Sequence, residues 1–138
     1  MRRTAALLAL ILAFPVVASA GDLFAPDLSD ATYPAGTWTF HGGVLTASQD
    51  NIIWTKAEFG DCVIDLEYNC DPAANSGIIV YCHDPADWMA GGVEIQILDD
   101  DAPKWKNVPK TWKCGAIFGH QAATKPLGKP AGAWNHMV

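Results

Sequence analysis

The chain has 138 residues and a formal net charge of −6, from fifteen acidic and nine basic residues. Its only arginines, Arg2 and Arg3, stand at the start of the chain. This acidic balance argues against nucleic acid and anionic membranes as partners, because both carry negative charge.

The first twenty residues have the pattern of a secretory signal peptide. The basic start precedes an apolar run over residues 5–17 and the small-x-small site Ala18-Ser19-Ala20. The apolar run is short for a membrane span, so an uncleaved anchor is the weaker alternative. We therefore expect a secreted or periplasmic protein whose mature chain begins at Gly21, with seven basic and fifteen acidic residues.

Short strands are expected along the rest of the chain. Residues 37–40 and 44–47 flank His41-Gly42-Gly43, which is typical of a hairpin. Further strands are expected at 52–55, 61–70, 78–82, 93–98 and 114–118, with glycine and proline turns between them. No segment after residue 20 sustains a helical period, so we predict an all-β fold, a sandwich or jelly roll.

The cysteines Cys62, Cys70, Cys82 and Cys114 all follow the expected cleavage site. Disulfides persist in the oxidising environment that an exported protein meets. Cys62 and Cys70 would lie about 27 Å apart on one extended strand, too far to pair. We favour a Cys82–Cys114 disulfide, because each residue lies near the end of a predicted strand. Zinc is the weaker alternative, since the sequence has no Cys-x-x-Cys pair.

The expected strand at 93–98 is the most informative one. Val93, Ile95 and Ile97 alternate onto one face, so Glu94 and Gln96 share the other face, about 7 Å apart. Asp99 follows at the end of the strand. These polar groups form either the floor of a cleft, suited to acid/base chemistry, or the solvent side of an ordinary amphipathic strand.

Residues 99–113 combine three acidic residues, four lysines, two prolines, Trp105 and Trp112. We expect a long loop beside the Glu94 strand, and long loops in compact domains are often functional. The two tryptophans either stack against the apolar face of a sugar or cover the hydrophobic edge of the fold.

Four segments in order carry a resemblance to a known family. They are Asn75-Ser76-Gly77-Ile78 and residues 92–99, 114–118 and 129–135. Together they resemble the 3-keto-disaccharide hydrolase domain of exported bacterial proteins, over nearly all of residues 21–138. The resemblance implies a concanavalin-like β-sandwich with a sugar cleft on its concave sheet, acting on a 3-keto-glycoside or oligosaccharide.

The chemistry that the resemblance implies needs an acid/base pair and a group that polarises an enolate. Glu94 is the expected base or acid, and Asp99 is the second carboxylate. Gln96 and Asn75 would hold sugar hydroxyls or the enolate oxygen, and a divalent cation at Glu94 and Asp99 would supply the polarising charge. Read without the family, Asn75-Ser76-Gly77 is a turn entering a strand, in which Gly77 takes an unusual φ.

The sequence departs from the family pattern at three places. Tyr81 stands about where the family often has an arginine, and Phe118 replaces a usual tyrosine. Met137-Val138 falls inside an expected strand, so we expect an incomplete domain. A non-catalytic carbohydrate-binding module and a structural exported β-domain therefore stay open beside the enzyme. The sequence does not specify the sugar, its linkage or the oligomeric state.

Overall fold

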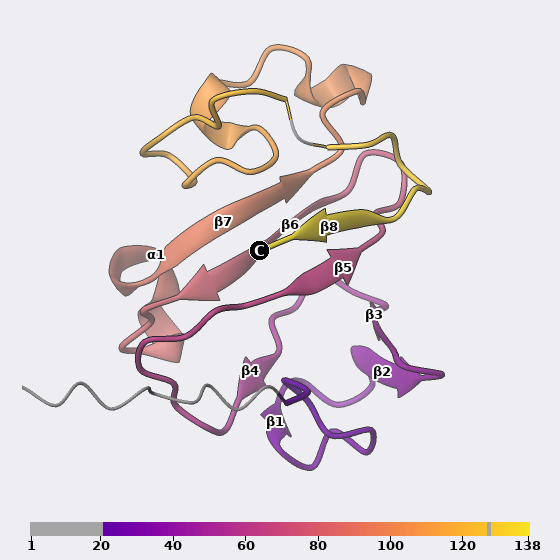
Figure 1. The fold of residues 1–138 in the computed structure, drawn as a ribbon, viewed down its shortest axis with the longest axis vertical. Coiled ribbons are helices and arrows are strands. Elements are labelled where there is room, and N and C mark those ends of the chain that lie inside the picture. Colours follow the sequence, from indigo (N-terminus) through magenta and orange to yellow (C-terminus); the bar gives the residue numbers. More distant parts are fainter. Residues whose placement is uncertain (1–20, 127) are drawn as a thin grey trace, which may run out of the picture. The chain divides into compact units, whose positions relative to one another are not determined.

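The protein is described by a computed structural model that covers residues 21–126 and 128–138. The expected signal peptide, residues 1–20, lies outside the described residues. The chain forms two compact units, which divide between Ala57 and Glu58. Figure 1 shows their strands.

The first unit contains the predicted hairpin. β2 (Trp38–His41) and β3 (Val44–Ala47) pair antiparallel, with Phe40 opposite Leu45. The turn consists of Gly42 and Gly43, with φ values of 58° and 81°. Two successive positive φ values fit a two-residue type I′ turn, which matches the twist of the strands and favours glycine. The hairpin prediction is confirmed, with β2 extended to His41.

A second strand pair in this unit is shorter than the sequence suggested. β4 (Trp54–Thr55) covers only half of the expected strand at 52–55 and pairs antiparallel with β1 (Ala31–Thr32). The pairing continues as the backbone N–H of Lys56 donates to the carbonyl of Asp30 at 2.8 Å. β1 was not predicted, because two residues are too few to show a period.

In the second unit, β6 (Asn75–Val80) and β7 (Val93–Leu98) form an antiparallel pair that runs from Asn75 opposite Leu98 to Val80 opposite Val93. The strand at 93–98 is confirmed. β6 starts three residues before the expected strand at 78–82 and ends two residues earlier. A 3₁₀ turn, η1 (Pro85–Asp87), and the short helix α1 (Trp88–Gly91) connect the two strands.

The other edge of β7 is covered by residues 115–118. Ile117 forms an antiparallel bridge with Ile95, and the backbone N–H of Phe118 donates to the carbonyl of Glu94 at 2.9 Å. The expected strand at 114–118 is therefore reduced to a bridge. It is interrupted because the N–H of Ala116 turns back to the carbonyl of Lys113.

β5 (Leu66–Tyr68) pairs antiparallel with β8 (Asn135–Met137). The expected strand at 61–70 thus shrinks to the three residues that find a partner. Alternation of burial survives on either side, since Ile64 and Cys70 are shielded while Val63 is 81% exposed. Cys62 breaks the expected alternation, because it is exposed.

The described residues are mostly strand and turn, with little helix. Apart from η1 and α1, the helical elements are two 3₁₀ turns, η2 (Pro103–Trp105) and η3 (Lys110–Trp112), in the expected long loop. In the part of the chain that the structure describes, the fold is therefore all-β and is built from four two-stranded sheets. No helix within residues 21–126 and 128–138 is long and apolar enough to cross a membrane.

The predicted Cys82–Cys114 disulfide is wrong, because all four cysteines are free. Cys82 follows the end of β6 that pairs with Val93, whereas the residue after Cys114 bonds Gln96 near the other end of β7. Several residue pairs along a ladder separate these ends by roughly 10–15 Å, beyond the reach of a disulfide. Cys114 instead lies 3.1 Å from the hydroxyl of Tyr68.

Candidate functional site

One face of the β6–β7 pair carries most of the candidate residues. Side chains on paired strands alternate between the two faces, and directly opposite residues share a face. The register therefore places Asn75, Gly77, Glu94 and Gln96 on the same side. The bridge between Ile95 and Ile117 adds Phe118, directly opposite Glu94. We call these five residues the Glu94 face.

Gly77 makes room for the side chain of Glu94. A Cβ atom at position 77 would lie 2.6 Å from Glu94 Cγ and 2.9 Å from its Cδ, closer than carbon atoms pack. Gly77 does not have a positive φ, so the expectation of an unusual turn conformation is wrong. The glycine serves close approach instead, because Glu94 lies across the backbone of β6 where any larger residue would stand.

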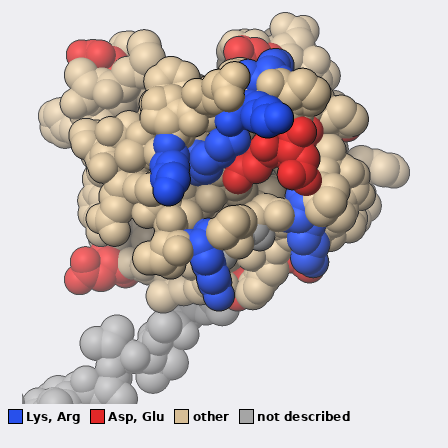
Figure 2. Space-filling view, turned by 90° about the horizontal axis from the view of Figure 1, so that it is seen from above, with Lys and Arg blue, Asp and Glu red and all other residues tan. Residues whose placement is uncertain are grey.

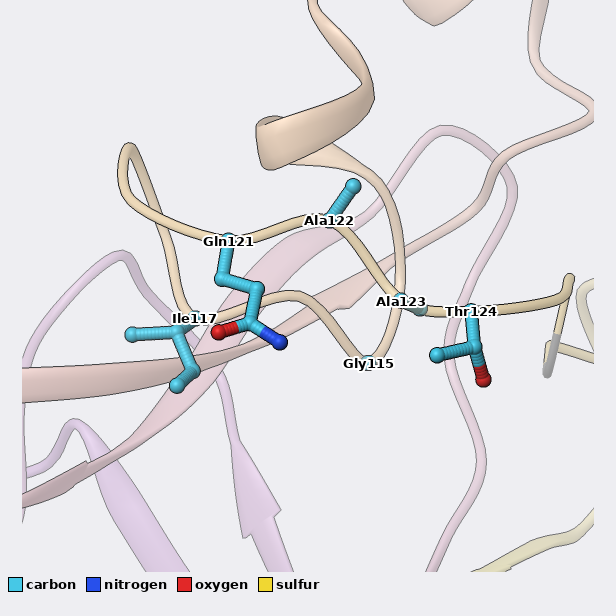
Figure 3. Close-up of a pocket in the computed structure, with 6 residues that line it drawn as sticks. All are labelled: Gly115, Ile117, Gln121, Ala122, Ala123 and Thr124. Carbon is cyan, nitrogen blue, oxygen red and sulfur yellow. The ribbon is translucent and has the colours of Figure 1, made fainter.

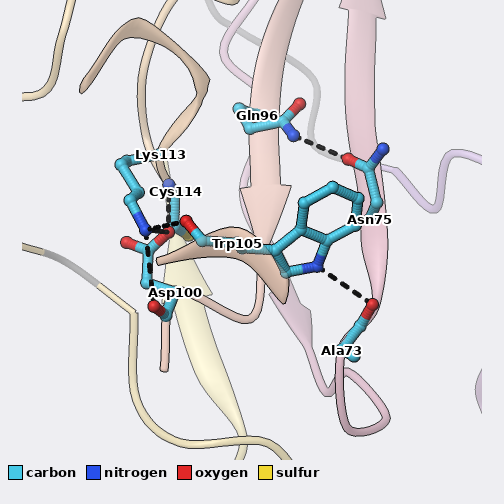
Figure 4. A network of polar contacts seen from close by, with 7 residues as sticks. All are labelled: Ala73, Asn75, Gln96, Asp100, Trp105, Lys113 and Cys114. Atoms are coloured by element: carbon cyan, nitrogen blue, oxygen red, sulfur yellow. Dashed lines mark hydrogen bonds and ion pairs between the residues drawn. The ribbon is translucent and has the colours of Figure 1, made fainter. Parts of the chain in front are cut away.

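Gln96 connects Asn75 with Glu94 beneath this face. Its side chain is almost fully buried, at 1% exposure, and its Nε2 donates to Asn75 Oδ1 at 2.7 Å (Figure 4). With the carboxamide turned by 180°, its nitrogen lies 3.2 Å from both Glu94 Oε1 and the carbonyl oxygen of Ser76. Gln96 is thus within hydrogen-bond distance of both neighbours.

Glu94 has the environment of a proton-transfer group. Burial raises the pKa of its carboxyl group above the ordinary value of 4.5, because desolvation disfavours the charged form. Among residues 21–126 and 128–138, no lysine or histidine forms an ion pair with it. A half-buried carboxyl group with a raised pKa is suited to give and take a proton.

Asp99 lies away from this arrangement. Its side chain is 7% exposed, and Oδ2 accepts a hydrogen bond from the backbone N–H of Ala73 at 2.7 Å. The backbone N–H of Asp99 also donates to the carbonyl of Ala74 at 3.1 Å. Asp99 thus fixes the turn before β6, in which Ala73 has a φ of 62°. Glu94 and Asp99 are five residues apart on an extended chain, or roughly 17 Å.

The residues present do not fit a divalent cation at Glu94 and Asp99. The two carboxyl groups lie at opposite ends of β7, and Asp99 is bonded to backbone. Within the described ranges, no three histidine, cysteine, aspartate or glutamate side chains gather as metal ligands. We therefore derive no catalytic step through a metal.

The two candidate tryptophans have different surroundings. Trp105 Nε1 donates to the carbonyl of Ala73 at 3.1 Å, and Lys104 Nζ lies 4.3 Å from its ring centroid. Lys113 Nζ donates to the carbonyl of Trp105 at 2.7 Å (Figure 4). These contacts hold Trp105 against Ala73, which precedes Asn75 by two residues in the chain. Lys113 Nζ also lies 3.9 Å from Asp100 Oδ1. Figure 2 shows a face of the molecule on which acidic and basic side chains lie against one another.

Trp112 borders the Glu94 face more directly. It is 41% exposed, and its ring packs on Phe118 with centroids 4.9 Å apart and planes tilted by 40°. Since Phe118 is opposite Glu94, these two rings form an aromatic wall beside the carboxyl group. The sequence noted Phe118 only as a departure from the family, and nothing local to it indicated this wall.

A separate hollow of about 290 Å³ lies beyond residues 115–118. Figure 3 shows its lining, which consists of Gly115, Ile117, Gln121, Ala122, Ala123 and Thr124. None of these residues carries a charge. The hollow therefore offers no acid/base chemistry, and the Glu94 face is the better candidate site.

Comparison with known proteins gives a similar solved structure and a matching family. The chain resembles a crystal structure described as a "Putative glycosyl hydrolase" from Parabacteroides distasonis ATCC 8503, with a TM-score of 0.80 and 45% sequence identity. The similarity covers 83% of this chain and 59% of that one, so the chain spans less than two thirds of that protein's length. A search of curated proteins found no match.

The protein is thus an all-β chain whose fold is similar to that of the structure described as a "Putative glycosyl hydrolase". The family model of the 3-keto-alpha-glucoside-1,2-lyase-like domain matches residues 20–138. The chain therefore belongs to this family, and the resemblance carried by its four ordered segments is confirmed.

Proposed function

We propose that this protein is a secreted carbohydrate-active enzyme that cleaves 3-keto-glycosides, with Glu94 as the group that moves the proton. The observation that carries the proposal is the position of Glu94, half-buried across Gly77 and within reach of Gln96. Family membership supports the 3-keto substrate class, and similarity to the structure described as a "Putative glycosyl hydrolase" supports action on glycosides. The proposal includes a concanavalin-like sandwich as the complete fold and export by residues 1–20.

The proposed reaction begins at the ketone on sugar C3, which acidifies the proton on C2. Glu94 removes that proton, and the electron pair forms an enolate. The enolate then expels the C1 substituent, whose oxygen receives a proton, and leaves a 1,2-unsaturated 3-keto sugar. Addition of water across this double bond gives the free 3-keto sugar. A base with a raised pKa suits the sequence, because it also returns the proton to the leaving oxygen.

Asn75 on β6 completes the proposed site on one side, and Trp112 completes it on the other. The exposed amide of Asn75 offers donors and acceptors to sugar hydroxyls or to the enolate oxygen. Gln96 is 1% exposed, so we assign it the role of holding Asn75 from beneath. The exposed ring of Trp112 offers an apolar surface on which a sugar face packs. Trp105 is tied to the carbonyl of Ala73, so we assign it a supporting role.

The test is turnover of a 3-keto-glucoside in D₂O by wild type and Glu94→Gln. We expect wild type to release the sugar with deuterium at C2, and the variant to lose about 100- to 10,000-fold in rate. The unoxidised glucoside should be inert, because its C2 proton is not acidic. Unchanged melting of Glu94→Gln would separate catalysis from folding. Wild-type turnover by the variant would exclude Glu94 as acid or base.

A carbohydrate-binding module is the second candidate, and the exposure of Trp112 on Phe118 favours it. This function predicts retention on an oligosaccharide without release of a 3-keto sugar. Trp112→Ala should abolish the retention, whereas Glu94→Gln should leave it. Loss of retention only in the Glu94 variant would contradict the module.

A further inference from the structure

The positive charge of this acidic chain is concentrated in one segment. Residues 99–129 hold six of its seven lysines and only three acidic residues. Residues 21–98, by contrast, hold one lysine and twelve acidic residues. Figure 2 shows lysine side chains gathered around a group of acidic ones on one face of the molecule. A local concentration of lysine in an acidic protein attracts a negatively charged ligand to that segment.

Half of these lysines are available to a ligand. Three are exposed and form no ion pair within the described residues, namely Lys106, Lys110 and Lys125. Two of the three nearby aspartates already have partners. Asp99 accepts the backbone N–H of Ala73, and Asp100 accepts that of Cys114 at 3.2 Å. Only Asp101 is exposed among the three, so most of the positive charge here is not neutralised by the protein itself.

The lysine-bearing segment borders the Glu94 face beside Asn75. Trp105, the last residue of η2, donates from its indole nitrogen to the carbonyl of Ala73 at 3.1 Å. Ala73 precedes Asn75 by two residues. Lys106 follows η2 directly, so its positive charge is held close to the exposed amide of Asn75.

The same segment also borders the Glu94 face beside Phe118. The carbonyl of Thr111 in η3 accepts the backbone N–H of Gly119 at 3.0 Å, one residue after Phe118. Lys110 is the first residue of η3. Trp112 in the same turn packs on Phe118 and is 41% exposed. A free positive charge and an exposed aromatic ring therefore lie on one short turn at the edge of the candidate site.

We propose that the glycoside bound at the Glu94 face carries a carboxylate group, as a uronate does, and that Lys106 and Lys110 recognise it. The identity of the ligand as a sugar rests on the proposed function, whereas its negative charge rests on the lysines. A lysine ammonium group is a compact point charge, which attracts a carboxylate without requiring a fixed geometry.

The spacing of the lysines favours a sugar with a low density of charge. Heparin and nucleic acids are typically bound by unbroken runs of lysine and arginine. Here the lysines are separated by uncharged residues, and no arginine follows Arg3. The acidic balance of the whole chain also opposes a long polyanion. A short oligosaccharide with one carboxylate on each sugar fits this pattern.

The test is binding of tetragalacturonate compared with its methyl ester, which has the same sugars and linkages without charge. Calorimetric titration at about 20 mM salt keeps screening weak. We expect the acid to bind about tenfold more tightly than the ester, because a few exposed ion pairs each contribute a few-fold. The difference should shrink at about 0.5 M salt. Equal dissociation constants for the two, or no binding of the acid, would overturn the inference.

Lys106→Gln and Lys110→Gln should each weaken binding of the acid about threefold, and the double variant about tenfold, since each substitution removes one exposed ion pair. Binding of the ester should not change. Lys56→Gln is the matched control, because Lys56 is the one lysine outside residues 99–129 and belongs to the first compact unit. It should leave both dissociation constants unchanged. Equal weakening by Lys56→Gln and Lys110→Gln would mean that net charge alone attracts the acid, contrary to the proposal.

Two further ligands distinguish a uronate from other anions. A thymidine oligonucleotide and a sulfated oligosaccharide with the same number of charges replace carboxylate by phosphate or sulfate. Tighter binding of either one than of tetragalacturonate would overturn the assignment of a carboxylate.

The titration needs no turnover, so it separates this proposal from the proposed function. A protein that binds the acid through Lys106 and Lys110 but releases no 3-keto sugar would refute the cleavage reaction and support the charged ligand. A protein that cleaves a 3-keto-glucoside but binds the acid and the ester equally would refute the charged ligand alone.

Discussion

The two ends of β7 carry the same functional group in opposite situations. At Asp99 the carboxylate accepts a backbone N–H and closes a turn. At Glu94 the carboxyl group lies across a glycine, next to the buried amide of Gln96, and burial raises its pKa. A carboxylate committed to backbone stabilises the fold, whereas one held by side chains and partly dehydrated keeps both protonation states accessible. Their common strand therefore says little about their roles.

The contrast between Asp99 and Glu94 can be tested by substitution, and we expect the largest effect from Gly77→Ala. The new Cβ would stand 2.6 Å from Glu94 Cγ, so the flexible carboxyl group must move away. Displacing a reacting group by about 1 Å can cost roughly 100-fold in rate, and we expect a loss of that order in kcat. Stability should change little, because alanine suits a strand better than glycine.

Gly91→Ala is the control for Gly77→Ala, since a Cβ at position 91 meets nothing within 4 Å. It should keep wild-type turnover. Steady-state kinetics with a 3-keto-glucoside measures both variants. A fully active Gly77→Ala protein would show that the position of Glu94 does not matter.

Asp99→Ala should instead destabilise the protein. It leaves the N–H of Ala73 without its acceptor, which costs about 1–3 kcal/mol in unfolding free energy. Asp99→Asn should recover most of this loss, because its amide oxygen also accepts the bond. Urea denaturation followed by tryptophan fluorescence measures the series. Loss of turnover at full stability would instead give Asp99 a catalytic role.

The pH dependence of stability should identify Glu94 without any substrate. Its pKa is raised in the folded state by burial, so the folded protein binds more protons there than the unfolded chain. The contribution of Glu94 to stability therefore falls as the pH rises from 4.5 through the folded pKa. Glu94→Gln lacks this loss, so its stability relative to wild type should increase with pH. If the stability difference between Glu94→Gln and wild type stayed constant from pH 4 to 8, it would contradict a raised pKa for Glu94.

The smallest effect is expected from Cys82→Ser, because no disulfide is lost. The free energy of unfolding should change by no more than about 0.5 kcal/mol, as for ordinary surface substitutions. Thiol labelling of the native protein supplies the comparison. Exposed Cys62 should react first, while Cys114 is 1% exposed and burial raises the pKa of the Cys70 thiol. A large loss of stability, or an oxidised Cys82, would contradict the finding that Cys82 is a free thiol.

Local sequence signals predicted those parts of the molecule whose cause is local. The Gly42-Gly43 turn and the alternation of residues 93–98 are examples, since each follows from backbone conformation or strand period. The shared face of Glu94 and Gln96 follows from the same period. Asn75 was expected through family resemblance, and only the register of β6 against β7 brings it to Gln96.

Features that depend on distant partners were not predicted correctly. Strand ends depend on whether a partner strand is present, so residues 61–70 were predicted too long. The prediction of a Cys82–Cys114 disulfide was wrong, because a position near the end of a strand does not show which strand ends lie together. The bond from Ala73 to the Asp99 carboxylate joins residues 26 positions apart, so the sequence around Asp99 does not indicate it. The role of Gly77 depends on the side chain of a neighbouring strand.

The pairing of β5 with β8 has a consequence for the order of folding. Leu66 opposite Met137 joins residues that are about 70 positions apart in the chain. The β6–β7 pair closes a far shorter loop, so its entropy cost is lower and it can form first. During synthesis, β5 must wait for β8 to leave the ribosome. The nascent chain therefore exposes an unpaired strand edge while about 70 further residues are added, and delayed pairing of this kind favours aggregation.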